Sequence, residues 1–150
     1  RCSQGAIVMS TEADFSEADR DAFRVKAIEQ RSAQVQTFAR SSDAVKAAQT
    51  ALQNPPFGTK NPEIKRQNAA VVLRALALAK DDRSIDAVVA ALDQAAADAL
   101  MKYLYRALAS ASNQQPAAPS QTQLFKWHAS VVRTHGMGCV VRALSDKQTA

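Results

Sequence analysis

The stretch from residue 100 to residue 108, Leu-Met-Lys-Tyr-Leu-Tyr-Arg-Ala-Leu, constrains the fold of this chain more than any other. On a helix, where each residue turns by about 100°, its apolar side chains cover roughly 200° of the circumference. Only Lys102 and Arg106, four residues apart, lie on the remaining polar strip. A surface helix needs an apolar stripe of only about 100°. We therefore expect this helix to have neighbours on two or more sides and to be the central helix of the domain.

The rest of the chain also predicts helices. Alanine accounts for about a fifth of the residues and aromatic residues are scarce, which is a helix-forming composition. Start and stop signals stand at the ends of the periodic segments, with Ser16 and Asn61-Pro62 at starts and Asn54-Pro55-Pro56 and Gly136 at ends. The first predicted helix follows Ser16 and ends near residue 40, and the next four span 44–52, 62 to about 80, 85–92 and about 95 to 109. Ser84 is the predicted cap of the helix over 85–92. A loop over 110–121 comes next, and it is followed by a sixth helix that ends at 135 and a seventh over 137–144. Residues 139–141 would also suit a short strand.

These segments predict an all-α fold of about seven helices, arranged as an α-α superhelix or a compact helical bundle. We expect a single helical domain over residues 16–150, preceded by a flexible N-terminal segment over residues 1–15. A domain of this size buries about 68 to 70% of its unfolded surface, which is enough for a real core. Met9-Ser10-Thr11-Glu12 has the form of a natural start, so residues 1–8 are expected not to be native.

Sequence features also predict the compartment. No stretch of about 20 apolar residues occurs, and the apolar run before Met9 is too short for the core of a signal peptide. The two cysteines, Cys2 and Cys139, lie far apart and do not suggest a disulfide framework. We therefore expect a cytoplasmic protein that does not enter a membrane.

The net charge of +5 is concentrated in the C-terminal third. Residues 1–98 hold thirteen basic and thirteen acidic side chains, whereas six basic residues and a single acid, Asp146, follow them. This excess favours an acidic partner, and a solvated face is the alternative. Basic and aromatic residues interleave near positions 102–106 and 125–127, as in some nucleic-acid-binding proteins. The helical period assigns most of these aromatics to the core, however, and such residues better suit a protein interface.

Three side chains, His128, His135 and Cys139, come nearest to a metal site or a nucleophilic pair. Their spacing lacks the adjacent ligand pair of a zinc motif, and only Asp146 follows to orient a Cys–His pair. His128 and Asn68 both fall inside apolar arcs, so we expect a core histidine and a hydrogen-bonded core amide. The chain has no phosphate-binding glycine motif and no paired carboxylates of the catalytic kind. It therefore predicts no enzyme activity, no metal and no cofactor.

Three runs of residues appear in an order that resembles a known family. They are Ala51-Leu52-Gln53-Asn54-Pro55-Pro56, the segment from Leu100 to Arg106, and Lys126-Trp127-His128 followed by Gly136 to Leu144. Together they resemble the family of the smallest subunit, subunit 5, of the actin-related protein 2/3 complex. The resemblance implies an all-helical α-α superhelix without catalytic activity or cofactor, and a structural role in the cytoplasmic, cytoskeletal assembly that nucleates branched actin filaments. It also implies docking on the WD40-propeller subunit and the twenty-kilodalton subunit, with an N-terminal segment that reaches toward an actin-related subunit.

The polar and amphipathic members of these runs are the candidate partner-binding residues, because they lie beside apolar arcs and within the basic third. They are Lys102, Tyr103, Arg106, Trp127 and Arg142. For Tyr103 and Trp127, a role in the core is the alternative. For the whole chain, the alternative is a small basic helical nucleic-acid-binding or adaptor module. Salt distinguishes the two functions, since binding to phosphates weakens steeply as salt rises.

Overall fold

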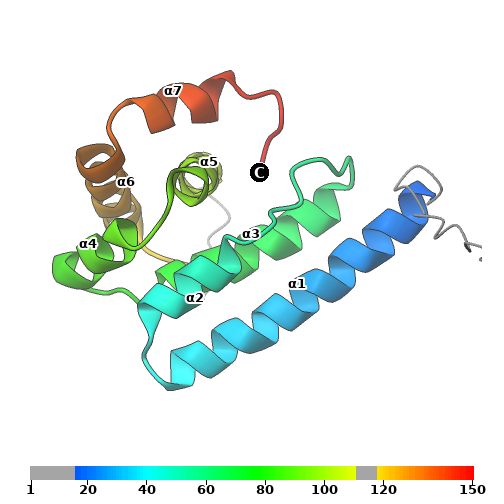
Figure 1. Cartoon of the computed structure of the whole chain (residues 1–150), viewed down its shortest axis with the longest axis horizontal. Helices are drawn as coiled ribbons and strands as arrows, with labels where there is room; N and C mark the ends of the chain where they lie inside the picture. Colours follow the sequence, from blue (N-terminus) through cyan, green and yellow to red (C-terminus); the bar gives the residue numbers. More distant parts are fainter. Residues whose placement is uncertain (1–15, 111–117) are drawn as a thin grey trace, which may run out of the picture.

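The computed structural model describes residues 16–110 and 118–150, and this part of the chain forms seven helices and no strand (Figure 1). The helices are α1 (Glu17–Arg40), α2 (Ala44–Ala51), α3 (Pro62–Leu76), α4 (Asp82–Ala90), α5 (Gln94–Ala109), α6 (Gln121–His135) and α7 (Gly138–Ser145). The all-α prediction is confirmed. The strand alternative for residues 139–141 is wrong, because these residues lie within α7. The predicted flexible segment over residues 1–15 lies outside the described residues, as do positions 111–117 of the predicted loop.

Helices pack mainly on helices that are one or two places away along the chain. α1 packs on α2 and α3, α2 packs on α3 and α4, and α4 packs on α6. Figure 1 shows α1, α2 and α3 side by side as one layer, with α5 between that layer and α7. This short-range order is typical of an α-α superhelix.

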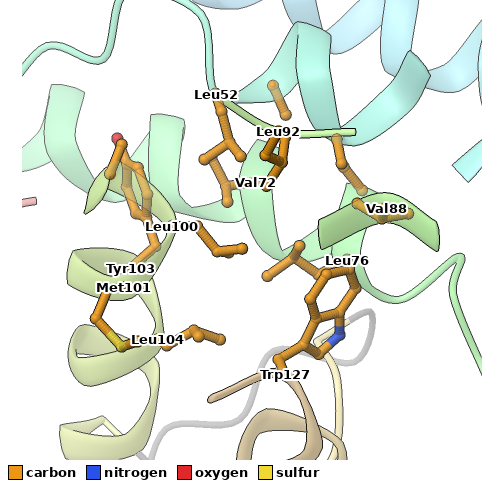
Figure 2. Close-up of a cluster of buried hydrophobic side chains, with 14 of the residues drawn as sticks. Leu52, Val72, Leu76, Val88, Leu92, Leu100, Met101, Tyr103, Leu104 and Trp127 are labelled. Atoms are coloured by element: carbon orange, nitrogen blue, oxygen red, sulfur yellow. The ribbon is translucent and has the colours of Figure 1, made fainter. Parts of the chain in front are cut away.

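α5 is the central helix, as the width of its apolar arc predicts. It contacts α3, α6 and α7. Leu100, Met101 and Leu104 are fully buried, and Figure 2 shows them in one cluster with Leu76 of α3 and Trp127 of α6. The expectation of neighbours on two or more sides is therefore confirmed.

The predicted start and stop signals take the expected local geometry. The Ser16 hydroxyl accepts a hydrogen bond from the backbone N–H of Asp19 at 3.2 Å, and the Asn61 side chain accepts one from Glu63 at 3.0 Å. These bonds satisfy backbone donors that the first turn of a helix leaves unpaired. Gly136 follows α6 with φ +78°, a left-handed conformation that glycine adopts without steric cost. Local sequence thus fixes where several of the helices begin and end.

Two predicted boundaries are wrong by part of a turn or more. α3 ends at Leu76 rather than near residue 80, because the N–H groups of Leu78 and Ala79 bond to carbonyls three residues back and tighten the chain into a turn. α4 begins at Asp82, so Ser84 lies inside it and does not cap it. The Ser84 hydroxyl instead donates to the carboxylate of Asp81 at 2.6 Å.

Candidate partner-binding surface

A groove of about 990 Å³ lies among the α2–α3 connection, the start of α5 and the last turns of α7. We call it the α2–α5–α7 groove. Its apolar lining includes Leu52, Pro55, Phe57, Leu92, Ala96 and Ala99. All three runs that carry the family resemblance reach it, through Asn54, Lys102 and Arg142 respectively. The fold therefore brings three distant segments of sequence to one concave surface.

Arg31 of α1 holds one wall of this groove in place. It is 9% exposed, and its guanidinium donates to the backbone carbonyls of Gln53 at 2.5 Å and Asn54 at 3.4 Å. Burial lowers the pKa of Arg31 from its usual value. Asn54 adopts φ +43°, which asparagine tolerates better than most residues. A buried cation thus fixes the turn that leads into Pro55 and Phe57.

Arg142 of α7 closes the opposite wall through a two-pronged ion pair with Asp98 of α5. Its Nε donates to one carboxylate oxygen at 2.6 Å and its Nη2 to the other at 3.0 Å. The side chain of Arg142 is 49% exposed, and its bonds to Asp98 raise its pKa. The paired geometry orients the guanidinium more firmly than a single contact would. Arg142 is also the most exposed of the five predicted partner-binding residues.

Lys102 is held inside the groove and offers little surface. Its side chain is 8% exposed, and its Nζ donates to Asp146 at 2.5 Å and to the Gln148 carbonyl at 2.9 Å. The ammonium also lies 4.4 Å from the centre of the Phe57 ring, within range of a cation–π contact. The hydrogen bond from Lys102 lowers the pKa of Asp146. Lys102 therefore joins α5 to the residues after α7.

Residues 146–150, which we call the C-terminal strap, run back from α7 toward α3 and α5 (Figure 1). Lys65 of α3 donates to the Thr149 carbonyl at 2.9 Å and to its hydroxyl at 3.0 Å. Arg106 of α5 donates to the Ala150 carbonyl at 2.5 Å, and Ala150 is only 9% exposed. Two predicted partner-binding cations, Lys102 and Arg106, thus bind this chain's own backbone.

Tyr103 and Trp127 belong to the core, which is the alternative role that the sequence left open for them. Tyr103 is 2% exposed and Trp127 is fully buried. The Tyr103 hydroxyl accepts a hydrogen bond from Asn68 Nδ2 at 2.5 Å, and burial raises the pKa of Tyr103 to about 12. The prediction that Asn68 is a hydrogen-bonded core amide is confirmed for its Nδ2, whereas its buried Oδ1 has no hydrogen-bond partner among the described residues. The two aromatic residues fix the helices behind the groove and present no surface themselves.

The candidate metal and nucleophile residues each have a local partner. His128 lies 3.1 Å from the Tyr105 hydroxyl, and His135 donates from Nε2 to the Val89 carbonyl at 3.1 Å. The Cys139 thiol donates to the Gly136 carbonyl at 2.9 Å, and burial raises its pKa, which disfavours the reactive thiolate. Within residues 16–110 and 118–150, no three histidine, cysteine or acidic side chains gather to hold a metal ion. His128 is half-buried at the edge of the core, less enclosed than its apolar arc predicts.

Most of the basic side chains in the C-terminal third form ion pairs with aspartates of the same chain. Besides the pairs of Lys102 and Arg142, Lys126 contacts Asp82 at 2.8 Å and Arg133 contacts Asp86. Asp86 also accepts from the buried Ser130 hydroxyl at 2.6 Å. Three of the four aspartates come from α4 and α5, so the charge imbalance seen along the sequence is partly cancelled in space. A continuous basic surface of the kind that binds phosphates is correspondingly weakened.

Sequence reasoning missed Asp98, Phe57 and the strap. Asp98 and Arg142 are 44 residues apart, and no local pattern links them. Phe57 stands in a turn where no periodicity applies. The exposed apolar residues at 137, 141 and 144 were also missed, although their spacing of four and three is itself a helical signal.

The described helices include none that is both long enough and apolar enough to cross a membrane. An all-helical domain with a broad, partly apolar groove, built on aromatic core residues, is the form of a protein-interaction subunit. A family model described as "ARP2/3 complex 16 kDa subunit (p16-Arc)" matches residues 8–150. The chain belongs to this family.

Curated relatives agree with the family match. The chain is 36% identical over 134 residues to actin-related protein 2/3 complex subunit 5A of Arabidopsis thaliana, which covers 89% of this chain and 96% of the relative. It is 39% identical over 103 residues to subunit 5 of Dictyostelium discoideum, with 69% of each chain covered. It is 32% identical over 116 residues to the human subunit 5-like protein, with 77% of this chain and 72% of the relative covered.

Proposed function

We propose that this chain is a non-catalytic structural subunit of an actin-related protein 2/3 complex, acting in the cytoplasm at the actin cytoskeleton. The observation that carries this proposal is the family match over residues 8–150. In this proposal the chain docks on the WD40-propeller subunit and on the twenty-kilodalton subunit, and so supports nucleation of branched actin filaments. A contact between the N-terminal segment and an actin-related subunit is part of the same proposal.

The side-chain contacts favour docking on protein over binding to nucleic acid. Lys102, Arg106 and Arg142 point their charged groups at Asp146, the Ala150 carbonyl and Asp98. Lys102 and Arg142 therefore line the groove and Arg106 holds the strap, and the three do not form a row of open cations. In this proposal Arg142 contacts a partner directly. Lys102 and Arg106 position the groove and the strap, and Tyr103 and Trp127 support them from the core.

Co-elution on size-exclusion chromatography tests the proposal, with the purified chain mixed with the propeller subunit and the twenty-kilodalton subunit. The test is run at about 0.15 M and about 1 M salt, where the screening length falls from about 8 Å to about 3 Å. A complex that survives both conditions is expected, because an interface with an apolar centre depends little on screening. No complex, together with salt-sensitive retention on immobilised nucleic acid, would support the alternative function instead.

Arg142→Ala examines the role of the groove, and Arg133→Ala is its matched control. Both arginines are exposed and each pairs with one aspartate, but only Arg142 lines the groove. We expect Arg142→Ala to weaken the complex and Arg133→Ala to leave it nearly unchanged. Equal effects from the two variants would argue against the groove as a docking surface.

A further inference from the structure

The C-terminal strap joins two helices that touch each other at few points. α3 and α5 are bridged directly by the buried hydrogen bond from Asn68 to Tyr103. The strap adds a second bridge, because Lys65 of α3 donates to Thr149 and Arg106 of α5 donates to the next residue of the strap. Lys65 precedes Asn68 by three residues, so both bridges start from one face of α3. The strap therefore closes the seam between the layer of α1, α2 and α3 and the helices that follow it.

Side chains of other elements, and not the backbone bonds of a helix, hold the strap in place. Residues 146–149 are exposed and belong to no helix, and only the last residue of the strap is buried. Apart from the backbone bond of Asp146 that ends α7, the described hydrogen bonds from the helices to the strap come from three cations, Lys65, Lys102 and Arg106. A segment held in this way opens at a lower free energy than a packed helix does. We therefore expect the strap to open while the helices stay folded.

Lys102 is the point at which the strap meets the α2–α5–α7 groove. It lines the groove, and its Nζ is held by Asp146 at 2.5 Å, by the Gln148 carbonyl at 2.9 Å and by the ring of Phe57. Phe57 belongs to the α2–α3 connection, whereas Asp146 directly follows α7. One ammonium group therefore contacts both walls of the groove, and one of these contacts depends on the strap.

We propose that the strap is a releasable clasp whose closure sets the shape and the charge of the α2–α5–α7 groove. With the clasp closed, Lys102 is paired with Asp146 and the seam between α3 and α5 is bridged twice. With the clasp open, both charges stand unpaired at the groove, and the seam keeps only the buried bond from Asn68. Where it concerns partners, this inference rests on the proposed function, to which it adds a regulation of the same groove.

The closed clasp is the form that suits a bound partner. A partner that fills the groove takes water away from Lys102 and Asp146, which both line it. Burying two paired charges costs much less than burying the same charges apart. Binding in the groove and closure of the strap therefore stabilise each other, and this coupling is reciprocal. A bound partner keeps the strap closed, and an open strap weakens the binding of the partner.

Acylation of the Lys102 amine measures the clasp on the free chain. A water-soluble N-hydroxysuccinimide ester reacts with an open, uncharged amine, and mass spectrometry of peptides gives the rate at each lysine. The clasp variant combines Lys65→Met and Arg106→Met, which keep long side chains but remove their bonds to the strap. We expect Lys102 to react about 10-fold faster in this variant, because loss of one charge-assisted bond shifts an opening equilibrium by that much or more.

The control variant combines Arg66→Met and Arg133→Met and removes the same amount of charge. These arginines pair with Glu63 and Asp86, and neither lines the groove or has a described bond to the strap. Lys102 is expected to react within about 2-fold of its wild-type rate, because exposed ion pairs contribute little. Circular dichroism and the thermal midpoint establish that both variants fold.

Titration with the propeller subunit and the twenty-kilodalton subunit measures the coupling to the groove. Neither Lys65 nor Arg106 lines the groove. We nevertheless expect the clasp variant to bind about 10-fold more weakly, an ordinary size for coupling between two sites, and the control to bind as the wild type does. In the wild type, Lys102 is expected to react more slowly in the assembly than in the free chain, a comparison that needs no variant.

The contrary outcomes separate the parts of the proposal. Equal acylation of Lys102 in the clasp variant and the wild type would overturn the clasp. Weaker binding in that case would mean that Lys65 or Arg106 contacts the partner directly. Faster acylation with unchanged binding would overturn the coupling to the groove. Failure of the wild type to assemble would contradict the proposed function instead, while the acylation rates of the free chain would still decide whether the strap opens.

Discussion

α5 and α7 have the same kind of apolar sequence pattern, but they differ in how far the rest of the chain buries them. Each is apolar on more than one side, and α5 is enclosed by α3, α6 and α7, so that Leu100 and Leu104 are fully buried. α7 is enclosed on its inner side only, and Val141 remains 60% exposed. A wide apolar arc therefore predicts how many neighbours a helix needs. It does not tell whether those neighbours belong to the same chain.

Trp127→Ala breaks the α5 side of this comparison and should have the largest effect. Trp127 fills the space beside Leu76 and Leu104 and is fully buried (Figure 2). Its removal is expected to lower the free energy of unfolding by about 3–5 kcal/mol, through lost burial and the cavity that remains. Urea denaturation measures this change. Phe125→Ala on the same helix is the control and should stay within about 0.5 kcal/mol, because Phe125 is exposed.

Tyr103→Phe probes the polar bond inside the α5 core at nearly constant volume. The variant removes the acceptor of Asn68 Nδ2 and leaves a buried amide donor unpaired. A loss of about 1–3 kcal/mol in the free energy of unfolding is expected. A double-mutant cycle with Asn68→Ala checks the cause. Additive losses in that cycle would mean that the two side chains do not stabilise each other.

Asp146 links the two regions, and its contribution depends on pH. The hydrogen bond from Lys102 lowers the pKa of Asp146 in the folded state below the ordinary value of 3.8. Because the folded-state pKa is depressed, the stabilisation is present above pH 3.8 and is lost as pH falls through the lower folded-state value. Asp146→Asn should therefore be less stable than the wild type at pH 6, with the difference shrinking below pH 4. Thermal unfolding from pH 2.5 to 6 measures this. A difference that does not vary with pH would exclude the ion pair as its source.

Val141→Ser sharpens the comparison at the α7 side and should have the smallest effect on stability. The side chain is exposed, so its loss is expected to change the free energy of unfolding by no more than about 0.5 kcal/mol. Urea denaturation beside the wild type is sufficient. A loss above about 1 kcal/mol, outside the usual range for a surface substitution, would mean that α7 is covered by its own chain after all.

Local signals predicted much of the fold. Capping residues such as Ser16 and Asn61, and the glycine at 136, act through bonds and dihedral angles within a few residues, so they can be recognised in sequence. The end of α3 was missed because the sequence after Leu76 stays apolar and contains no breaker, and a tightened turn ends the helix instead.

The candidate surface was predicted less well, for a physical reason. Whether a basic side chain is open to a partner depends on which acids or carbonyls it meets in space. Lys102 meets Asp146 across 44 positions, and Lys65 meets Thr149 across 84. Pairs so far apart in the sequence produce no periodic pattern from which they could be predicted. Tyr103 and Trp127 were ambiguous because amphipathic aromatic residues suit a core and an interface equally.

The C-terminal strap has a practical consequence for labelling this protein. Ala150 is buried, and its carbonyl is bound by Arg106. A residue that carries a bulky fluorophore, substituted for Ala150, would place the fluorophore within the packing of α3 and α5 and would disturb the bonds that hold the strap. A label attached at Lys26 of α1, which is exposed and lies outside the strap, avoids this conflict. The choice of attachment point therefore decides whether an imaging experiment reports on a protein with its strap in place or on one whose strap has been pulled away.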